Sequence, residues 1–269
     1  MNPHSNAVVF ADLHKGPSPL RLPNAWDAGS ARLIENLGAS AIATTSAGVA
    51  WSMGYRDRDA MPLGQHLASV AAIARVINVP LSVDIESGYT GETEDVRNTV
   101  GRFIDAGAAG INIQDGHSTP DVLAGKIESA REAGERCGVR IYINARTDVY
   151  ALGLVPTGDR VTEVLARAKR YADAGADGLF VLGVAARADI KQIAAGTDLL
   201  LNVIAWPELP PATELAALGV RRVSVGSWIP QSLWAHTSTL VTDFLTDGRS
   251  EPLFEGAAPY SQVDALFSN

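Results

Sequence analysis

Cysteine is almost absent from this chain. Cys137 is the one cysteine among 269 residues, so the chain cannot form an internal disulfide. A chain without disulfides fits a reducing compartment, and we expect a cytoplasmic protein. Cys137 comes at the end of a predicted helix, just before a predicted strand, where we expect a packed thiol.

Positive charge and long apolar runs are scarce as well. Lys and Arg number 22 against 30 Asp and Glu, which gives a net charge of −8 and a pI near 5.1. Such an acidic chain is a poor partner for nucleic acid or an anionic membrane, and we expect neither. No uncharged apolar run reaches about 18 residues, so we expect no membrane span. The first residues, Met1 to Asn6, lack the pattern of a secretory signal.

What the chain does contain is a regular alternation of short apolar strands and amphipathic helices. Helix ends with glycine recur before apolar strands, and Gly38, Gly107 and Gly175 lie 69 and 68 residues apart. Two helix–strand units of about 34 residues fit each interval, as eight units in roughly 250 residues require. We therefore predict an α/β fold, a (β/α)8 TIM-type barrel. An open doubly wound sheet is the alternative, disfavoured because no glycine-rich dinucleotide turn follows the first strand.

The predicted domain organisation is a single α/β-barrel domain over residues 1–269. Residues 1–19 form an N-terminal arm, residues 20–227 the barrel core, and residues 228–269 a C-terminal helix and tail. The tail segment carries more apolar surface than a lone barrel needs, which favours a homo-oligomer.

The segment from Pro80 to Gly91 organises the predicted site. Its apolar strand ends in Asp84 and Glu86, which are two residues apart and would share one face of a strand. Two carboxylates at the end of a buried strand are costly unless a cation lies between them. A divalent metal is the simplest candidate.

Other polar residues also follow predicted strands, where barrel enzymes carry their chemistry. The shared position predicts an acidic, oxygen-rich pocket with Arg146 as its fixed cation. Such a pocket suits Mg²⁺, with Mn²⁺ possible, and a small carboxylated substrate. The residues are Thr45, Ser46 and Ala47 in a loop rich in N–H donors, Asp57, Gln114, Asp115, Arg146, Asp148 and Asn202.

Five ordered motifs resemble the isocitrate lyase/phosphoenolpyruvate mutase superfamily. The segment Ser-Val-Asp-Ile-Glu-Ser-Gly-Tyr at 82–89 is similar to the Asp-x-Asp-x-Gly-Tyr-Gly strand of that superfamily. The resemblance covers about residues 20–234. The other motifs are Asn24-Ala25-Trp26-Asp27, Gly54-Tyr55-Arg56-Asp57, Ile113-Gln114-Asp115 and Asn144-Ala145-Arg146-Thr147-Asp148.

The resemblance implies a barrel whose eighth helix is swapped between subunits of a homodimer or homotetramer, and it implies Mg²⁺. Asp84 corresponds to the direct metal ligand, while Asp57, Glu86 and Gln114 correspond to acids that hold metal-bound waters. We predict that Thr45, Ser46, Ala47, Asp84, Arg146 and Asn202 bind the substrate, and that Arg146, Asp57 and His117 have catalytic roles.

Two departures from the superfamily pattern narrow the activity. Gln114 stands where an acid is expected, and the loop from Gly116 to Pro120 has no Cys motif. The loop argues against isocitrate or methylisocitrate cleavage. We predict an Mg²⁺-dependent lyase or decarboxylase that acts on a small α-keto or 2-hydroxy acid through a metal-stabilised enolate.

Three alternatives stay open at this point. One is a phosphonopyruvate hydrolase or a carboxyphosphonoenolpyruvate or phosphoenolpyruvate mutase. Another is a non-catalytic α-keto acid binder. The third, a Schiff-base aldolase, requires a lysine at a strand end, and each lysine falls on a predicted helix or loop.

Overall fold

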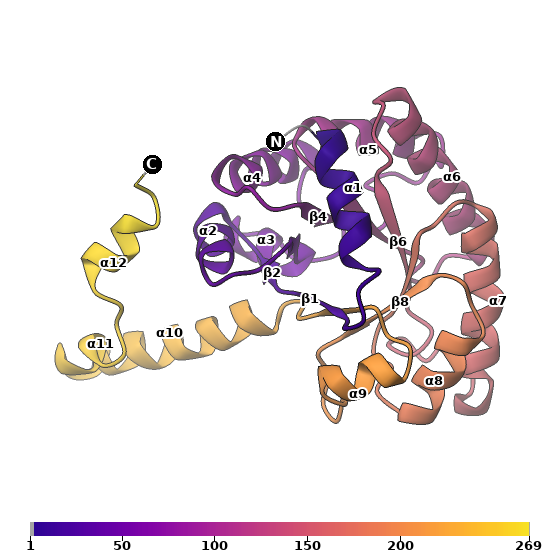
Figure 1. Cartoon of the computed structure of the whole chain (residues 1–269). Helices are drawn as coiled ribbons and strands as arrows, with labels where there is room; N and C mark the ends of the chain where they lie inside the picture. The colour runs from indigo at the N-terminus through magenta and orange to yellow at the C-terminus, as the bar shows by residue number, and fades with distance from the viewer. Residues whose placement is uncertain (1–2, 269) are drawn as a thin grey trace.

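The structure is a computed structural model that describes residues 3–268 (Figure 1). Nine parallel strands form a nearly closed barrel with helices between them, which confirms the predicted TIM-type architecture. Apart from β1 and β9, the first and last strands of the chain, each neighbouring pair of strands is joined by a helical crossover, as parallel pairing requires. The strands are β1 (Leu20–Leu22), β2 (Asn24–Ala25), β3 (Ile42–Thr44), β4 (Leu81–Asp84), β5 (Gly110–Gln114), β6 (Tyr142–Thr147), β7 (Gly178–Val181), β8 (Leu200–Ile204) and β9 (Arg222–Ser224).

The ninth strand arises because Pro23 separates β1 from β2. Proline has no N–H to donate, so the ladder cannot continue through it. β1 pairs with β9 and β2 pairs with β3, and the Pro23 carbonyl still accepts from the N–H of Ala43 at 3.0 Å. One divided strand therefore serves two neighbours and closes the barrel.

The helices cover the outside of the sheet in the predicted order (Figure 1). Their amphipathic faces pack on one apolar core that includes Val100, Phe103 and Ile127. The helices are α1 (Pro3–Leu13), α2 (Ala28–Asn36), α3 (Ser46–Ser52), α4 (Leu63–Val76), α5 (Asp95–Asp105), α6 (Pro120–Arg136), α7 (Arg160–Asp173) after the short 3-10 turn η1 (Thr157–Asp159), α8 (Arg187–Ala195), α9 (Ala212–Ala217), α10 (Trp228–Asp247), α11 (Glu251–Phe254) and α12 (Tyr260–Ala265).

Helix α3 replaces most of the loop predicted after β3. Thr45 has extended backbone and precedes the helix, and its carbonyl accepts from the N–H of Val49 at 3.0 Å to close the first turn. Gly48 lets this helix lie close to the barrel, because a Cβ there would come within 2.9 Å of the Trp26 Cβ. The sequence pattern missed the helix because its residues are small and lack helical periodicity.

Helix α1 covers the N-terminal end of the barrel. Phe10 is fully buried and contacts Tyr142 edge to face at 5.4 Å, while His14 stacks on the same ring at 4.3 Å. Gly110 accommodates this packing, since a Cβ at that position would lie 2.7 Å from the Phe10 ring. The opposite, C-terminal end of the barrel is thus the end left for a site.

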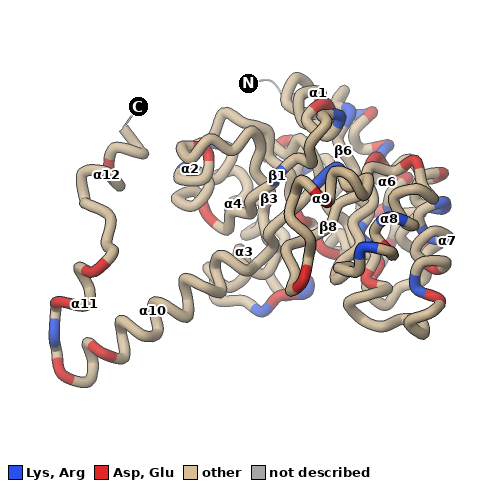
Figure 2. Tube along the Cα trace, turned by 60° about the horizontal axis from the view of Figure 1, so that its bottom comes forward, with Lys and Arg blue, Asp and Glu red and all other residues tan. Residues whose placement is uncertain are grey.

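Helix α10 leaves the barrel and carries α11 and α12 away from it (Figure 1). Residues 228–242 contain no Lys, Arg, Asp or Glu, and Figure 2 shows this part of the helix without charge. Trp234 is 61% exposed. Where an eighth helix could pack on β1 and β9, a groove of about 760 Å³ is lined by Leu20, Leu22, Ile34, Leu37 and Val223, among others.

The structure also bears on the environment of Cys137 and on the expected lack of a membrane span. Cys137 is exposed at the C-terminal end of α6, so the prediction of a packed thiol is wrong. The helix end itself lies at the surface, which the local pattern could not show. Within residues 3–268, no helix combines the length and apolar character needed to cross a bilayer.

Candidate active site

Asp84, the last residue of β4, is the centre of the candidate site. Its side chain is buried, and its Oδ2 accepts from the hydroxyl of Ser46 at 3.2 Å. Burial raises the pKa of Asp84, the positive charge of Arg146 lowers it, and the negative charge of Asp57 raises it. These electrostatic effects show that residues from three segments converge on this carboxylate.

Glu86 lies beside Asp84, but not for the reason the sequence indicated. β4 ends at Asp84, and Glu86 has a left-handed backbone with φ of +54°, so strand alternation does not place it. Its own N–H donates to Asp84 Oδ1 at 3.1 Å, and its carboxylate accepts from the N–H of Asp59. Burial, with the neighbouring acids, raises the pKa of Glu86 to about 7.

Tyr89 and His66 form a hydrogen-bonded chain that ends on Glu86. The sequence analysis missed both residues. The Tyr89 hydroxyl donates to Glu86 Oε1 at 3.3 Å and lies 2.8 Å from His66 Nδ1. Burial lowers the pKa of His66 to about 4, so its ring is neutral and Nδ1–H can donate to the hydroxyl oxygen. Tyr89 could have been singled out because it belongs to the Gly-Tyr pair of the motif after β4. No sequence pattern marked His66 as a site residue.

Asp57 comes from the loop between α3 and α4. Its Oδ1 is buried and has no hydrogen-bond partner among the described residues. A carboxylate oxygen in this state is costly unless a water or cation reaches it. Gln114 ends β5 next to Arg146 in the register of β5 and β6, and its N–H donates to the Glu86 carbonyl at 2.9 Å.

Arg146 lies near the end of β6 with its side chain mostly buried. Its Nε donates to Asp148 Oδ1 at 2.7 Å, and its guanidinium lies 5.9 Å from the centre of the Phe180 ring. The sequence left open whether this arginine bridges Asp148 or binds a substrate carboxylate. The structure shows the bridge, which engages Nε and leaves Nη1 and Nη2 for another acceptor.

Thr45, Ser46 and Ala47 are buried where β3 meets α3. The N–H groups of a first helical turn have no partner within their own helix. Since Ser46 also donates to Asp84, this segment lies next to the acids.

Two predicted residues lie apart from that cluster. His117 is exposed on the turn between β5 and α6. Asn202 is fully buried in the barrel interior, where its amide nitrogen donates to Val203 and its Oδ1 accepts from Asn144 at 2.9 Å. The same interior layer holds Arg222, which donates to Asn112 at 3.1 Å and which the sequence analysis did not single out.

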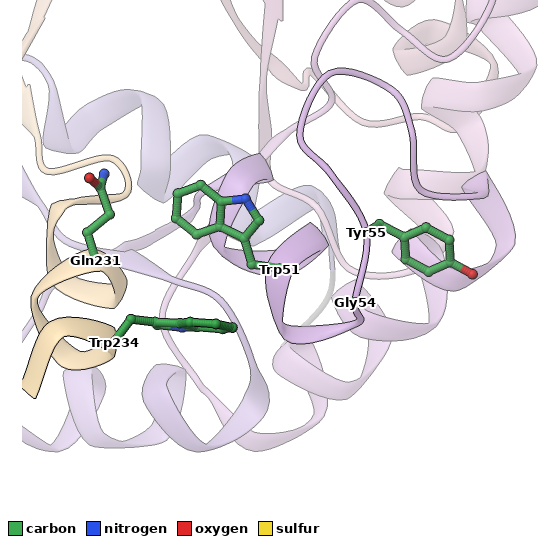
Figure 3. A pocket seen from close by; sticks show the side chains of 5 residues that line it. All are labelled: Trp51, Gly54, Tyr55, Gln231 and Trp234. Carbon is green, nitrogen blue, oxygen red and sulfur yellow. The ribbon is translucent and has the colours of Figure 1, made fainter. Parts of the chain in front are cut away.

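An aromatic hollow of about 580 Å³ lies outside the acid cluster, between α3 and the start of α10. Figure 3 shows the indole of Trp51 face-on beside that of Trp234, which is seen edge-on, with Gln231 on α10 and the Tyr55 ring pointing away from them. The hollow has no acid in its lining. It is therefore a surface for apolar packing rather than for a metal.

Mg²⁺ fits the donor set of the cluster. Asp84, Glu86 and Asp57 supply hard oxygen atoms, the ligand type this ion prefers, and the unpartnered Asp57 oxygen is a place for a metal-bound water. Within residues 3–268, no three His, Cys, Asp or Glu side chains come together as a complete ligand set.

The fold and these side chains define an α/β barrel with an acidic rim and one fixed arginine. The family model described as "Phosphoenolpyruvate phosphomutase" matches residues 10–245. The chain belongs to this family, and with it to the isocitrate lyase/phosphoenolpyruvate mutase superfamily, as its motifs indicated.

Known relatives differ in activity. The chain is 30% identical to an oxaloacetate decarboxylase of Pseudomonas fluorescens over 81% of this chain and 77% of that one. A crystal structure of a candidate phosphonomutase from Burkholderia cenocepacia is 39% identical, with a TM-score of 0.84, covering 88% of this chain and 99% of that one. Oxaloacetate acetylhydrolase in complex with the product oxalate has the same fold, with 23% identity and a TM-score of 0.83, covering 99% of this chain and 95% of that one.

Proposed function

We propose that this protein is an Mg²⁺-dependent carbon–carbon lyase of the decarboxylase type, acting on a small α-keto or 2-hydroxy dicarboxylic acid such as oxaloacetate. The observation that carries the proposal is the contact of Glu86 with Asp84, whose Oδ1 accepts from the Glu86 N–H at 3.1 Å, with the charges of Asp57 and Arg146 near enough to shift the pKa of Asp84. Relatives that carry out lyase-type reactions on oxaloacetate support it.

Asp84 would hold Mg²⁺ directly, and Asp57, Glu86 and Gln114 would hold its waters. When bound, the ion supplies a Lewis acid that stabilises negative charge developing on the keto oxygen. The fit depends on the carboxylates being ionised. Burial, followed by the charges of the neighbouring acids, raises the pKa of Glu86, and a bound cation would favour its ionised form.

The chain's own residues would orient the substrate. Nη1 and Nη2 of Arg146 form a planar fork that suits a carboxylate. The N–H groups of Ser46 and Ala47 would donate to the keto acid end, since they open α3 beside Asp84. This grip would leave the second carboxylate free to depart as carbon dioxide, while the bond electrons move toward the keto group.

A proton must then reach the carbon that lost its carboxylate. His117 is our candidate, because it lies on the turn after β5 and an imidazole can donate or accept a proton. His117→Asn should slow turnover of oxaloacetate, while His4→Asn, on α1 at the other end of the barrel, should leave it unchanged.

The decisive experiment is turnover by the wild type and Asp84→Asn with Mg²⁺ on a panel of oxaloacetate, phosphonopyruvate and alkylmalates. We expect pyruvate from oxaloacetate, and a fall of at least about a thousandfold in kcat/KM for Asp84→Asn. Asp105→Asn, at the end of α5, is the control that should keep full activity. Full activity in Asp84→Asn would refute the proposal.

A phosphonopyruvate hydrolase or phosphomutase is the second candidate, favoured by the likeness to the candidate phosphonomutase. The panel separates it, because phosphate release or a rearranged phosphonate would appear only with phosphonopyruvate. A non-catalytic binder is favoured by one observation, the amide of Gln114 in place of an acid. Metal-dependent ligand binding without turnover of any compound would establish that third reading.

A further inference from the structure

A buried hydrogen-bond network lies behind Arg146, and Asp115 is its hub. The Asp115 side chain is fully buried immediately after β5. Its Oδ2 accepts from Arg167 Nη1 at 2.7 Å and from the Tyr171 hydroxyl at 2.8 Å, while its Oδ1 accepts from the N–H of Asp148 at 2.9 Å. Both carboxylate oxygens are therefore occupied, so Asp115 does not replace the missing acid at Gln114.

The network reaches Arg146 by two routes. The N–H of Asp115 donates to the carbonyl of Arg146 at 3.1 Å, which fixes the end of β6 against the end of β5. Through its side chain, Asp115 holds the backbone of Asp148, whose carboxylate accepts from Arg146 Nε. Position and orientation of the guanidinium are thus both set by Asp115.

Helix α7 supplies the outer half of the network. Arg167 and Tyr171 are one helical turn apart on the face that packs against β6, on the outside of the barrel (Figure 1). Arg167 is itself oriented by Glu163, which accepts from its Nε at 2.7 Å. The side chains of Asp115, Arg167 and Tyr171 are buried, so water does not compete for their hydrogen bonds and each side chain is held in one orientation.

We propose that Arg167 and Tyr171 are positioning residues that, through Asp115 and Asp148, fix the fork of Arg146 for a carboxylate ligand. This inference rests on the proposed function. Neither residue touches the ligand. An arginine held at Nε in one rotamer loses less freedom when Nη1 and Nη2 bind, which raises affinity.

A purely structural reading of the network is the competing explanation. A brace that only stabilises the barrel would lower the midpoint of thermal unfolding when broken and would leave ligand affinity unchanged. A matched pair exists at the other end of the barrel, where Arg131 of α6 donates to Asp177 at 2.7 Å just before β7. Arg131→Lys therefore removes the same kind of ion pair without touching the end that carries Arg146.

The experiment measures oxalate binding to the full-length Mg²⁺-loaded protein by calorimetry, with the thermal unfolding midpoint measured on the same samples. We expect Arg167→Lys to raise the Kd for oxalate by about tenfold or more and Tyr171→Phe by about fivefold, because hydrogen bonds to a charged group are lost. Arg131→Lys should lower the unfolding midpoint and leave the Kd within about twofold of wild type.

Turnover gives a second readout that folding alone would not move. With the substrate that the panel identifies, Arg167→Lys and Tyr171→Phe should raise KM much more than they lower kcat. If wild type binds oxalate and both brace variants bind it equally well, the positioning role is refuted while the proposed function stands. If the wild-type protein neither binds oxalate nor turns over any compound of the panel, the proposed function is refuted, and the positioning role that rests on it is refuted as well.

Discussion

Arg146 and Asp148, two residues apart at the end of β6, form an ion pair in which Nε donates to Oδ1 at 2.7 Å. The pair engages Nε alone, and the positive charge of Arg146 lowers the pKa of Asp84. A structural bridge and a ligand-binding role are therefore compatible in the same arginine.

Replacing Arg146 by lysine tests the fork directly. Arg146→Lys keeps the charge but removes the planar donor pair, so we expect the Kd for oxalate to rise by roughly a hundredfold. Calorimetry in the presence of Mg²⁺ measures it. Arg97→Lys, which alters a surface pair with Glu132, is the matched control and should bind oxalate as wild type does. Equal affinity in Arg146→Lys would show that another group holds the carboxylate.

Tyr89 should matter to the metal rather than to the fold. Tyr89→Phe removes the hydroxyl between His66 and Glu86 but keeps the ring that contacts His66 and Phe103. We expect the Mg²⁺ dissociation constant to rise by about tenfold, as loss of an outer hydrogen bond to a metal-site carboxylate commonly does.

Tyr150→Phe serves as the control for that variant. It removes a similar hydroxyl–carboxylate bond, from Tyr150 to Asp189 at 2.8 Å. Titration of activity and of heat release against Mg²⁺ compares the two. An unchanged magnesium requirement in Tyr89→Phe would mean that Glu86 does not depend on this hydroxyl.

His14 should make the protein sensitive to acid. Burial lowers the pKa of His14 to about 3, from 6.5 in the unfolded chain, with the charge of Arg222 acting in the same direction. Between these values the unfolded state binds the extra proton, so the free energy of unfolding falls as pH drops, by up to about 1.4 kcal/mol per pH unit. The contribution of His14 is complete above pH 6.5.

Urea denaturation at pH 7, 6 and 5 tests the assignment. His14→Gln removes the titrating ring, so its unfolding free energy should fall less steeply with acid than that of wild type, even if it is lower at pH 7. His117→Gln, at an exposed position on the turn after β5, should keep the wild-type slope. Parallel curves for wild type and His14→Gln would contradict the prediction.

Helix α10 should mediate self-association. We propose that its uncharged first part packs against a second copy, over the apolar groove on β1 and β9 where the chain's own eighth helix could lie. Trp234→Glu would bury a charge in that contact, and we expect it to produce monomers at micromolar concentration. Sedimentation velocity measures the result.

Val122→Glu provides the control, because Val122 is an exposed apolar residue on α6, away from the groove. It should sediment as wild type does. A wild-type protein that is already a monomer would refute the proposed association outright.

The order of strands and helices was predictable because it depends on local patterns. The Gly junctions at Gly38, Gly107 and Gly175 each have positive φ, so the glycine that ended a helix in the sequence also ends it in the structure. The extent of β5, Gly110–Gln114, agrees with the prediction residue for residue. An apolar run that directly follows such a glycine can be assigned as a strand with few alternatives.

Features that depend on tertiary contacts were not predictable. Strand alternation suggested that Asp84 and Glu86 share a face, yet a left-handed turn held by Asp59 and Tyr89 places Glu86. Asp115 belonged to a recognised motif, but its partner Tyr171 lies 56 residues further along the chain. Helical periodicity predicts that Tyr171 faces the barrel, but it does not predict which polar group its hydroxyl contacts. That contact is defined only by the packing of α7 against the strands.

The division of the first strand at Pro23 has a consequence for synthesis. Leu20 has its sheet partner in Arg222, about three quarters of the chain length further along, so β1 and β9 cannot pair while the ribosome is still translating the middle of the protein. Until β9 emerges, the apolar edge of β1 is open to water and to other chains. The nascent protein is thus most vulnerable to aggregation just before its final strand arrives, and a chaperone that covers residues 20–25 would act at that moment.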